Sequence, residues 1–171
     1  MNLFPALCVM SALAFGQATT TTTTSTSTTT AKPAAKATAK PGAKAGRLVE
    51  ITTGDNMKYD VTEITAKPGE SLRVVVKNTG AMPKIAMAHN FVLLKAGTDV
   101  AEFTKAAFNA RETDFIPPAM KDAVLANTVL AGAGESVEIT FKAPAKPGTY
   151  TFVCSFPGHF ALGMRGTLTV K

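Results

Sequence analysis

The stretch Cys154-Ser155-Phe156-Pro157-Gly158-His159-Phe160-Ala161-Leu162-Gly163-Met164 lies between two segments with the two-residue period of β-strands. The first of these segments runs from Thr149 to Cys154 and the second from Gly166 to Val170. The loop contains a thiol, an imidazole and a thioether, which are side chains that bind soft or borderline metal ions. A single loop therefore offers three ligands to one metal.

A fourth ligand is available from a distant segment. The chain has 2 histidines, and the one outside the loop is His89. Together, His89, Cys154, His159 and Met164 form the set that is typical of blue copper sites, in which two imidazoles and a thiolate lie in a plane and a long axial thioether completes the site. Filling core space is the common role of a methionine such as Met164, and a lone histidine such as His89 is more often an ordinary strand residue. The combination predicts one copper ion that alternates between Cu(I) and Cu(II).

Two further residues are expected to support these ligands. A thiolate in a dry cavity needs hydrogen bonds, and the backbone N–H groups of Asn90 and Phe156 are the predicted donors. The Asn90 side chain is expected to tie the two ligand-bearing segments together.

The first 46 residues differ in composition from the rest of the chain. Residues 1–16 are almost wholly apolar and end in a small-x-small site before Gln17, which predicts a signal peptide, although a misassigned start codon or a retained tail would be alternatives. Residues 17–46 are rich first in Thr and Ser and then in Ala, Lys and Pro, which predicts a disordered linker. Residues 47–171 are predicted to form the copper domain.

The signal peptide predicts a periplasmic or otherwise exported protein. Cys8 lies inside that peptide, so the mature chain would keep only Cys154. A lone thiol cannot form an intramolecular disulfide in an oxidising compartment, and a metal bond would give it a role.

Charge argues against a nucleic-acid partner. The chain has 18 basic and 12 acidic residues, and four of the lysines (Lys32, Lys36, Lys40 and Lys44) lie in the linker. The predicted domain is therefore nearly neutral and has no basic helix or nucleic-acid motif. Contact with a membrane is expected only through the basic tail, if at all.

Several short strands with turn signals between them predict an all-β fold, a Greek-key sandwich with one short helical insertion. The expected strands are 57–65, 71–77, 89–95, 136–142, 149–154 and 166–170. Pro68-Gly69 and Pro147-Gly148 are the expected turns. Asp99 and Glu102 predict the start of a helix over 99–109, and 111–127 is expected to be an irregular flap.

Other functions fit the residues less well. Cys154, His159 and Asn90 superficially match the nucleophile set of thiol proteases, but the thiol and the imidazole share one short loop after a strand. Copper enzymes with a second metal centre need more histidines. We therefore predict that the chain is not an enzyme. A copper carrier or store without electron transfer is the alternative function, and a structural zinc site is a further possibility.

The chain from about Leu48 to Lys171 resembles the azurins and auracyanins, which are small blue copper proteins of the cupredoxin fold. The resemblance is densest in Met82-Pro83-Lys84-Ile85-Ala86-Met87-Ala88-His89-Asn90, in Cys154-Ser155-Phe156-Pro157-Gly158-His159 and in Gly166-Thr167-Leu168-Thr169-Val170. It implies a cupredoxin sandwich with copper near one end and His159 as the most exposed ligand. In azurins the residue at position 88 is usually Gly with a distant carbonyl contact to copper, so the role of Ala88 stays open.

The resemblance also implies a soluble one-electron carrier that docks transiently on redox partner proteins. Electrons would pass through the His159 imidazole at an apolar patch. The residues of this predicted docking patch are Met82, Ala86, Met87, Pro157, Phe160, Ala161 and Leu162.

Overall fold

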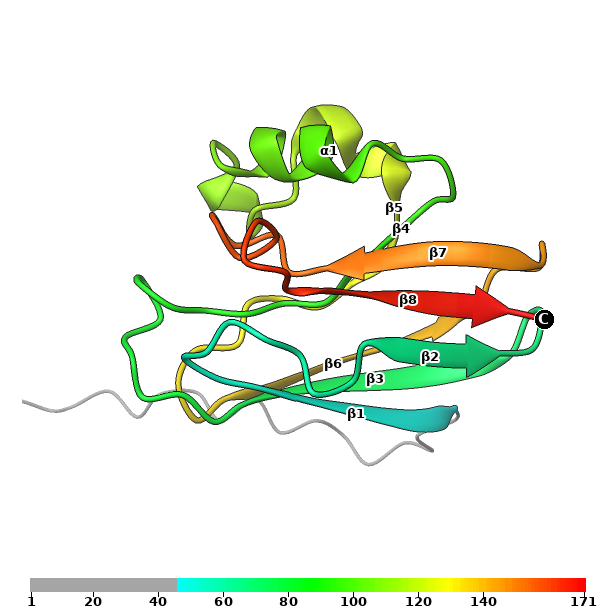
Figure 1. Cartoon of the computed structure of the whole chain (residues 1–171), viewed down its shortest axis with the longest axis horizontal. Helices are drawn as coiled ribbons and strands as arrows, with labels where there is room; N and C mark the ends of the chain where they lie inside the picture. Colours follow the sequence, from blue (N-terminus) through cyan, green and yellow to red (C-terminus); the bar gives the residue numbers. More distant parts are fainter. Residues whose placement is uncertain (1–45) are drawn as a thin grey trace, which may run out of the picture. The chain divides into compact units, whose positions relative to one another are not determined.

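The computed structural model describes residues 46–171, which form two packed β-sheets and a helical insertion (Figure 1). The predicted signal peptide and, apart from Gly46, the predicted linker lie outside the described residues. The elements in chain order are β1 (Arg47–Thr53), β2 (Glu63–Ala66), β3 (Ser71–Asn78), β4 (Val92–Leu94), α1 (Val100–Ala107), the 3-10 turns η1 (Arg111–Thr113) and η2 (Pro118–Ala123), β5 (Val124–Asn127), β6 (Ser136–Lys142), β7 (Gly148–Val153) and β8 (Arg165–Val170).

The chain alternates between the two sheets. One sheet has the strand order β1-β3-β6 and the other the order β2-β8-β7-β4-β5. β1 pairs with β3 and β2 with β8 in parallel, and the remaining pairs are antiparallel. Strands that are neighbours in the sequence thus often lie in different sheets. The predicted β-sandwich of the cupredoxin type is confirmed.

Alternating side chains of both sheets fill the space between them. In β1 and β8 every second residue is buried, including Ile51 and Leu168. Phe91 and Phe152 meet in the middle of this core with ring centroids 5.0 Å apart. Each fully buried side chain of this size stabilises the fold by roughly 1.5–3 kcal/mol. The core therefore provides a rigid frame for the loops at its ends.

The helical insertion covers the outer face of the second sheet. Asp99 caps α1 by accepting a hydrogen bond of 2.9 Å from the Glu102 backbone N–H, as predicted. Phe103 of α1 packs in a second apolar cluster with Val92 of β4 and Val153 of β7. This cover explains why all three residues of β4 are buried, since both faces of the strand contact protein.

The structure differs from the predicted elements in four places. The predicted strand over 89–95 is a strand only over Val92–Leu94, and His89 forms an isolated bridge instead. The predicted strand over 57–65 is a strand only from Glu63, because Met57 has a left-handed backbone with φ of 53° and residues 54–62 form a loop. The expected flap over 111–127 contains two 3-10 turns and ends in β5, where Leu93 pairs with Ala126. β1 was not among the predicted strands.

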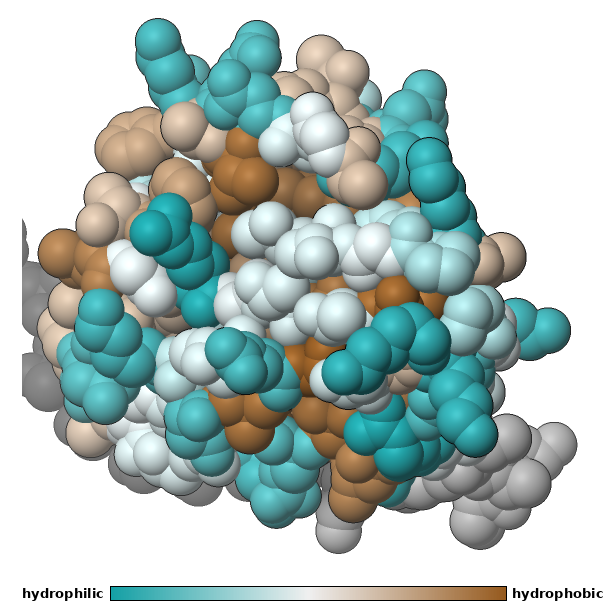
Figure 2. All heavy atoms as spheres, turned by 45° about the vertical axis from the view of Figure 1, so that its right-hand side comes forward, coloured by the Kyte–Doolittle hydropathy of each residue, from teal (hydrophilic) through white to brown (hydrophobic). Residues whose placement is uncertain are grey.

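Figure 2 shows the face of the sandwich that is reached by turning the right-hand side of Figure 1 forward. Hydrophilic side chains rim this face, and apolar side chains appear between them in separate places. Among residues 46–171 no helix has the length and apolar character needed to cross a bilayer.

We predict that Gly166→Ala destabilises the sandwich by about 1–3 kcal/mol, which is the usual cost of overpacking a core. A Cβ at this position in β8 would lie 2.5 Å from the Thr62 carbonyl oxygen and 2.1 Å from Cζ of the buried Phe152. Gly54→Ala is the matched control, because its nearest neighbour would be at an ordinary 3.4 Å. Urea unfolding measures the stability of both variants. Equal midpoints for the two would contradict this account of the packing.

Candidate metal centre

The loop with the predicted ligands closes the hairpin of β7 and β8. The last pair of the ladder is Val153 with Arg165, and the Cys154 N–H donates to the Met164 carbonyl at 3.1 Å. The Met164 N–H in turn donates to the His159 carbonyl at 3.0 Å. Cys154, His159 and Met164 are all buried. Backbone hydrogen bonds thus join the three loop residues before any metal binds.

His89 reaches the same place from the segment before β4. Its backbone forms an isolated antiparallel bridge with Ala131, with hydrogen bonds of 3.0 and 2.7 Å. The side chain is completely buried, and among the described residues no group makes a hydrogen bond of good geometry with either ring nitrogen, although the Gly54 carbonyl lies close to the ring. A buried imidazole without partners is costly, so this ring is arranged for a partner that the protein atoms do not provide.

The structure brings His89, Cys154 and His159 together. One ligand atom from each lies within 4.8 Å of the other two. The Cys154 sulfur is 3.4 Å from Nδ1 of His159, and the centroids of the two imidazoles are 4.9 Å apart. Met164 lies next to this cluster through its backbone bonds, and the Ala88 carbonyl oxygen is 3.9 Å from the sulfur. The residues therefore converge from two segments that are distant in the sequence.

Burial controls the protonation of the three groups. It raises the pKa of the Cys154 thiol to about 12, although hydrogen bonds from the backbone N–H groups of Asn90 and Phe156 work against this shift. Burial and the neighbouring His89 lower the pKa of His159 to about 4. Burial also lowers the pKa of His89, which the nearby Gly54 carbonyl and Asp55 partly oppose. Both imidazoles are thus neutral at pH 7 and have a lone pair available for a metal.

Asn90 connects the two ligand-bearing segments through its side chain. Its Oδ1 accepts from the Ser155 backbone N–H at 2.9 Å, and its Nδ2 donates to the Ser155 hydroxyl at 2.9 Å and to the Asp114 carbonyl at 3.2 Å. Asn90 and Ser155 are both buried. The residue that follows His89 is thereby fixed to the residue that follows Cys154.

The predicted docking patch is mostly on the surface. Met82, Ala86, Ala161 and Leu162 are exposed, and Pro157 and Phe160 are half-buried. Met87 is only 8% exposed, so including it in a surface patch was wrong: it belongs to the buried run that leads to His89.

Three residues on the surface around the site or beside its ligands were not among the predicted ones. Ile85 is 71% exposed and lies inside the sequence block that carries His89, so its position in that block could have indicated that it belongs to the docking patch. Phe108 follows α1 and lines a shallow groove with Phe156 and Phe160, which only the folded chain brings together. The Gly54 carbonyl beside His89 gave no signal in the sequence.

The donor set fits a type 1 copper ion. Two neutral imidazoles and one thiol are the side chains of that site, and both ring nitrogens of His89 are buried without a well-formed hydrogen bond to any described residue. The Gly54 carbonyl beside the ring is the kind of group to which a metal-binding histidine donates its second N–H. Copper would replace the proton of the thiol, since metal ligands bind in deprotonated form.

Comparisons with known proteins agree with this chemistry. A family model described as copper binding proteins of the plastocyanin/azurin family matches residues 45–171. Auracyanin-B from Chloroflexus aurantiacus is 47% identical over 87 residues, which are 50% of this chain and 37% of auracyanin-B. Azurin iso-2 from Methylomonas sp. strain J is 38% identical over 125 residues, which are 71% of this chain and 95% of that protein.

A solved structure shows the same similarity in three dimensions. The reduced auracyanin of Roseiflexus castenholzii aligns with a TM-score of 0.64 and 41% sequence identity, covering 76% of this chain and 99% of that chain.

We predict that Asn90→Ala lowers the free energy of unfolding of the metal-free protein by about 1–3 kcal/mol, because the buried Ser155 N–H loses its acceptor. Asn127→Ala is the control, since Asn127 is half-buried and its amide donates only to the adjacent Thr128 carbonyl. Chemical unfolding followed by circular dichroism gives both values. A loss no larger than that of the control would show that Asn90 does not join the segments.

Proposed function

The chain belongs to the plastocyanin/azurin family of copper-binding proteins, and from that premise we propose that it carries single electrons between redox proteins outside the cytoplasm. The observation that carries the proposal is the buried cluster of His89, Cys154 and His159 at the end of a rigid sandwich. The copper ion, when bound, supplies the one-electron couple between Cu(II) and Cu(I).

Each ligand has a distinct role in this proposal. His89, Cys154 and His159 would bind the ion, and Met164, which lies beside them, would be a further ligand. Loop hydrogen bonds and the Asn90 bridge keep these donors in place whichever charge the ion has. Because the donors are held by the fold, little rearrangement accompanies a change of one electron, which favours fast transfer.

The polypeptide also controls access to the site. The three donors are nearly free of contact with solvent, so water is kept from the ion. His159 belongs to the same loop as the exposed Ala161 and Leu162. We infer that a partner protein docks over this loop and that electrons leave through the edge of the His159 ring.

The docking surface is proposed to comprise Met82, Ala86, Pro157, Phe160, Ala161 and Leu162, extended by the exposed Ile85. Apolar surface groups of this kind mark sites of protein association. A small and mostly apolar contact suits a partner that must leave after each transfer.

The two rival functions fit the geometry less well. In a Cys-His-Asn catalytic set the Asn amide oxygen would accept from the histidine ring, but the Asn90 Oδ1 accepts from the Ser155 backbone N–H instead. A copper carrier or store has to exchange its metal, and a buried thiol with two buried imidazoles hinders exchange. We therefore propose that the chain is not an enzyme and that copper stays bound as its cofactor.

Export is the remaining part of the proposal. The apolar run at 1–16 with its small-x-small end supports a signal peptide, and the lysines of 17–46 could bring that segment to anionic lipid surfaces. Both segments lie outside the described residues.

We predict that the copper-loaded protein has an intense blue band from thiolate-to-copper charge transfer and that Cys154→Ala abolishes it. The band should bleach on adding ascorbate and return on adding ferricyanide, as measured by absorption spectroscopy. Circular dichroism serves as the control that the variant is folded. A copper complex of the unaltered protein that is colourless and redox-silent would refute electron transfer.

We further predict that Leu162→Glu slows electron self-exchange between oxidised and reduced copies at least about tenfold, because two like charges would face each other across the contact. Leu48→Glu in β1 changes the net charge equally at a site of similar exposure, 48% against 51% for Leu162. NMR line broadening in mixtures of the two redox forms measures the rate. Equal slowing in both variants would exclude this loop as the docking surface.

A further inference from the structure

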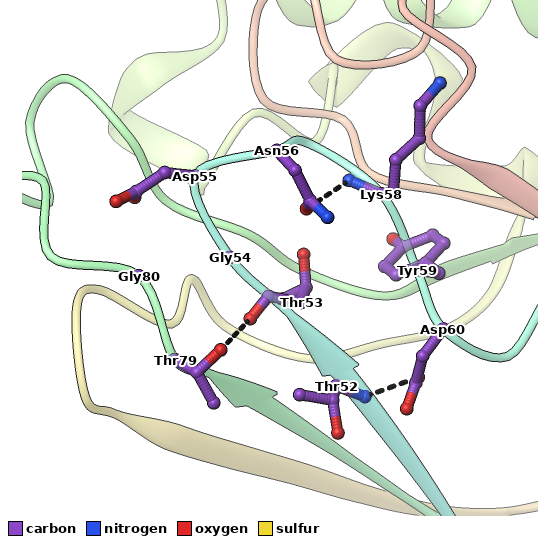
Figure 3. A pocket seen from close by; sticks show the side chains of 10 residues that line it. All are labelled: Thr52, Thr53, Gly54, Asp55, Asn56, Lys58, Tyr59, Asp60, Thr79 and Gly80. Atoms are coloured by element: carbon purple, nitrogen blue, oxygen red, sulfur yellow. Dashed lines mark hydrogen bonds between the residues drawn. The ribbon is translucent and has the colours of Figure 1, made fainter.

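The loop of residues 54–62 between β1 and β2 contacts both ligand-bearing segments. Figure 3 shows the side chains of Lys58 and Tyr59 leaving this loop in different directions. The Lys58 ammonium group donates to the carbonyl of Leu162, between the second histidine and the methionine of the metal loop. The Tyr59 hydroxyl donates to the Asn90 carbonyl, next to the first histidine. One loop therefore holds the two segments from the outside.

Tyr59 is a permanent donor in this arrangement. Its side chain is only 5% exposed, and its ring packs on Phe152 with centroids 5.6 Å apart. Burial and, to a smaller extent, repulsion from the Cys154 sulfur once it is ionised raise the pKa of Tyr59 well above its usual value. The hydroxyl thus keeps its proton throughout the neutral pH range.

Asn90 uses each of its polar groups at the metal centre. Its backbone N–H points to the Cys154 sulfur, and its amide binds Ser155. Its carbonyl accepts from Tyr59, which in the part of the chain that the structure describes is the one donor that reaches it. Because Asn90 precedes β4, the sheet ladder does not hold this carbonyl. Without the tyrosine hydroxyl a buried carbonyl would be unpaired, and the backbone would lose a restraint.

We propose that Tyr59 is a positioning residue of the metal centre: its hydroxyl fixes the backbone of Asn90 and thereby keeps the Asn90 N–H directed at the Cys154 sulfur. The link to electron transfer rests on the proposed function, whereas the link to the sulfur does not need a metal. A hydrogen bond to the thiolate stabilises its negative charge and weakens its donation to Cu(II), so it raises the reduction potential. Tyr59 would therefore raise the reduction potential of a metal centre that it does not contact directly.

The test compares Tyr59→Phe with Tyr150→Phe. Tyr150 is the other tyrosine of the chain; it is 6% exposed, belongs to the same apolar core, and its hydroxyl donates to the Lys146 carbonyl at 2.7 Å. Both variants lose one tyrosine hydroxyl that donates to a backbone carbonyl, but only the first loss is at Asn90. Amide hydrogen exchange of metal-free protein is followed by NMR, with the Val74 amide of β3 as internal reference for global stability.

In Tyr59→Phe we expect the Asn90 amide to exchange at least about tenfold faster relative to the reference, with no such change in Tyr150→Phe. In the copper-loaded form the reduction potential of Tyr59→Phe should fall and its thiolate band should shift. An unchanged Asn90 exchange rate, or an equal increase in both variants, would overturn the proposal. A protein without a blue band would refute the electron-carrier function while the exchange result still decided the role of Tyr59.

Discussion

Two imidazoles and a thiol are buried against one another at the end of the sandwich, and the two ring nitrogens of His89 make no well-formed hydrogen bond with the described residues. Burying polar groups in this way destabilises a protein unless something pairs with them. The surrounding structure maintains the arrangement all the same, through the hairpin closure at Cys154 and the bridge between His89 and Ala131. A bound copper ion satisfies these groups, so the metal and the fold stabilise each other.

Both segments that carry the candidate ligands extend from strands of the same five-stranded sheet. The hairpin of β7 and β8 carries the loop with Cys154, and the segment before β4 carries His89. Asn90 and the loop before β2 join these parts by hydrogen bonds rather than by a covalent link. The insertion with α1 covers the outer face of β4 and β7, so both strands that lead to ligands are packed on two sides. Such support is what a metal site needs if it is to keep its geometry during redox change.

Much of the fold could be predicted because local signals were strong. The alternation of Ser136–Lys142 fixed both ends of β6, and the capping pair Asp99 and Glu102 located the start of α1. The failures have physical causes. The left-handed backbone of Met57 could not be recognised from its residue type. β5 follows η2, and the adjacent prolines Pro117 and Pro118 suggested an irregular segment there. Long-range pairing decides such strands more than composition does.

The candidate site was likewise predictable only in part. Ligand types and spacing within one loop are legible in a sequence, and the structure places Cys154 and His159 beside His89. Their roles as ligands, with Met164, remain predictions, as do the signal peptide and linker. The loop 54–62 could not be connected with the site in advance, because its contacts depend on how β1 and β2 are arranged in separate sheets. Met87 was assigned to the surface patch because the sequence does not show whether an apolar residue near a ligand faces water or the interior.

The position of β8 has a consequence for how the protein matures. This strand lies between β2 and β7, although it is the last of the strands to be synthesised. Until residues 165–170 are available, β2 has no neighbour in its sheet and the loop that ends at Met164 cannot close. Among the described strands, the five-stranded sheet is therefore complete only when β8 has been inserted between β2 and β7. Because the same step closes the loop that holds Cys154, His159 and Met164, the candidate ligands would come together only after this last insertion.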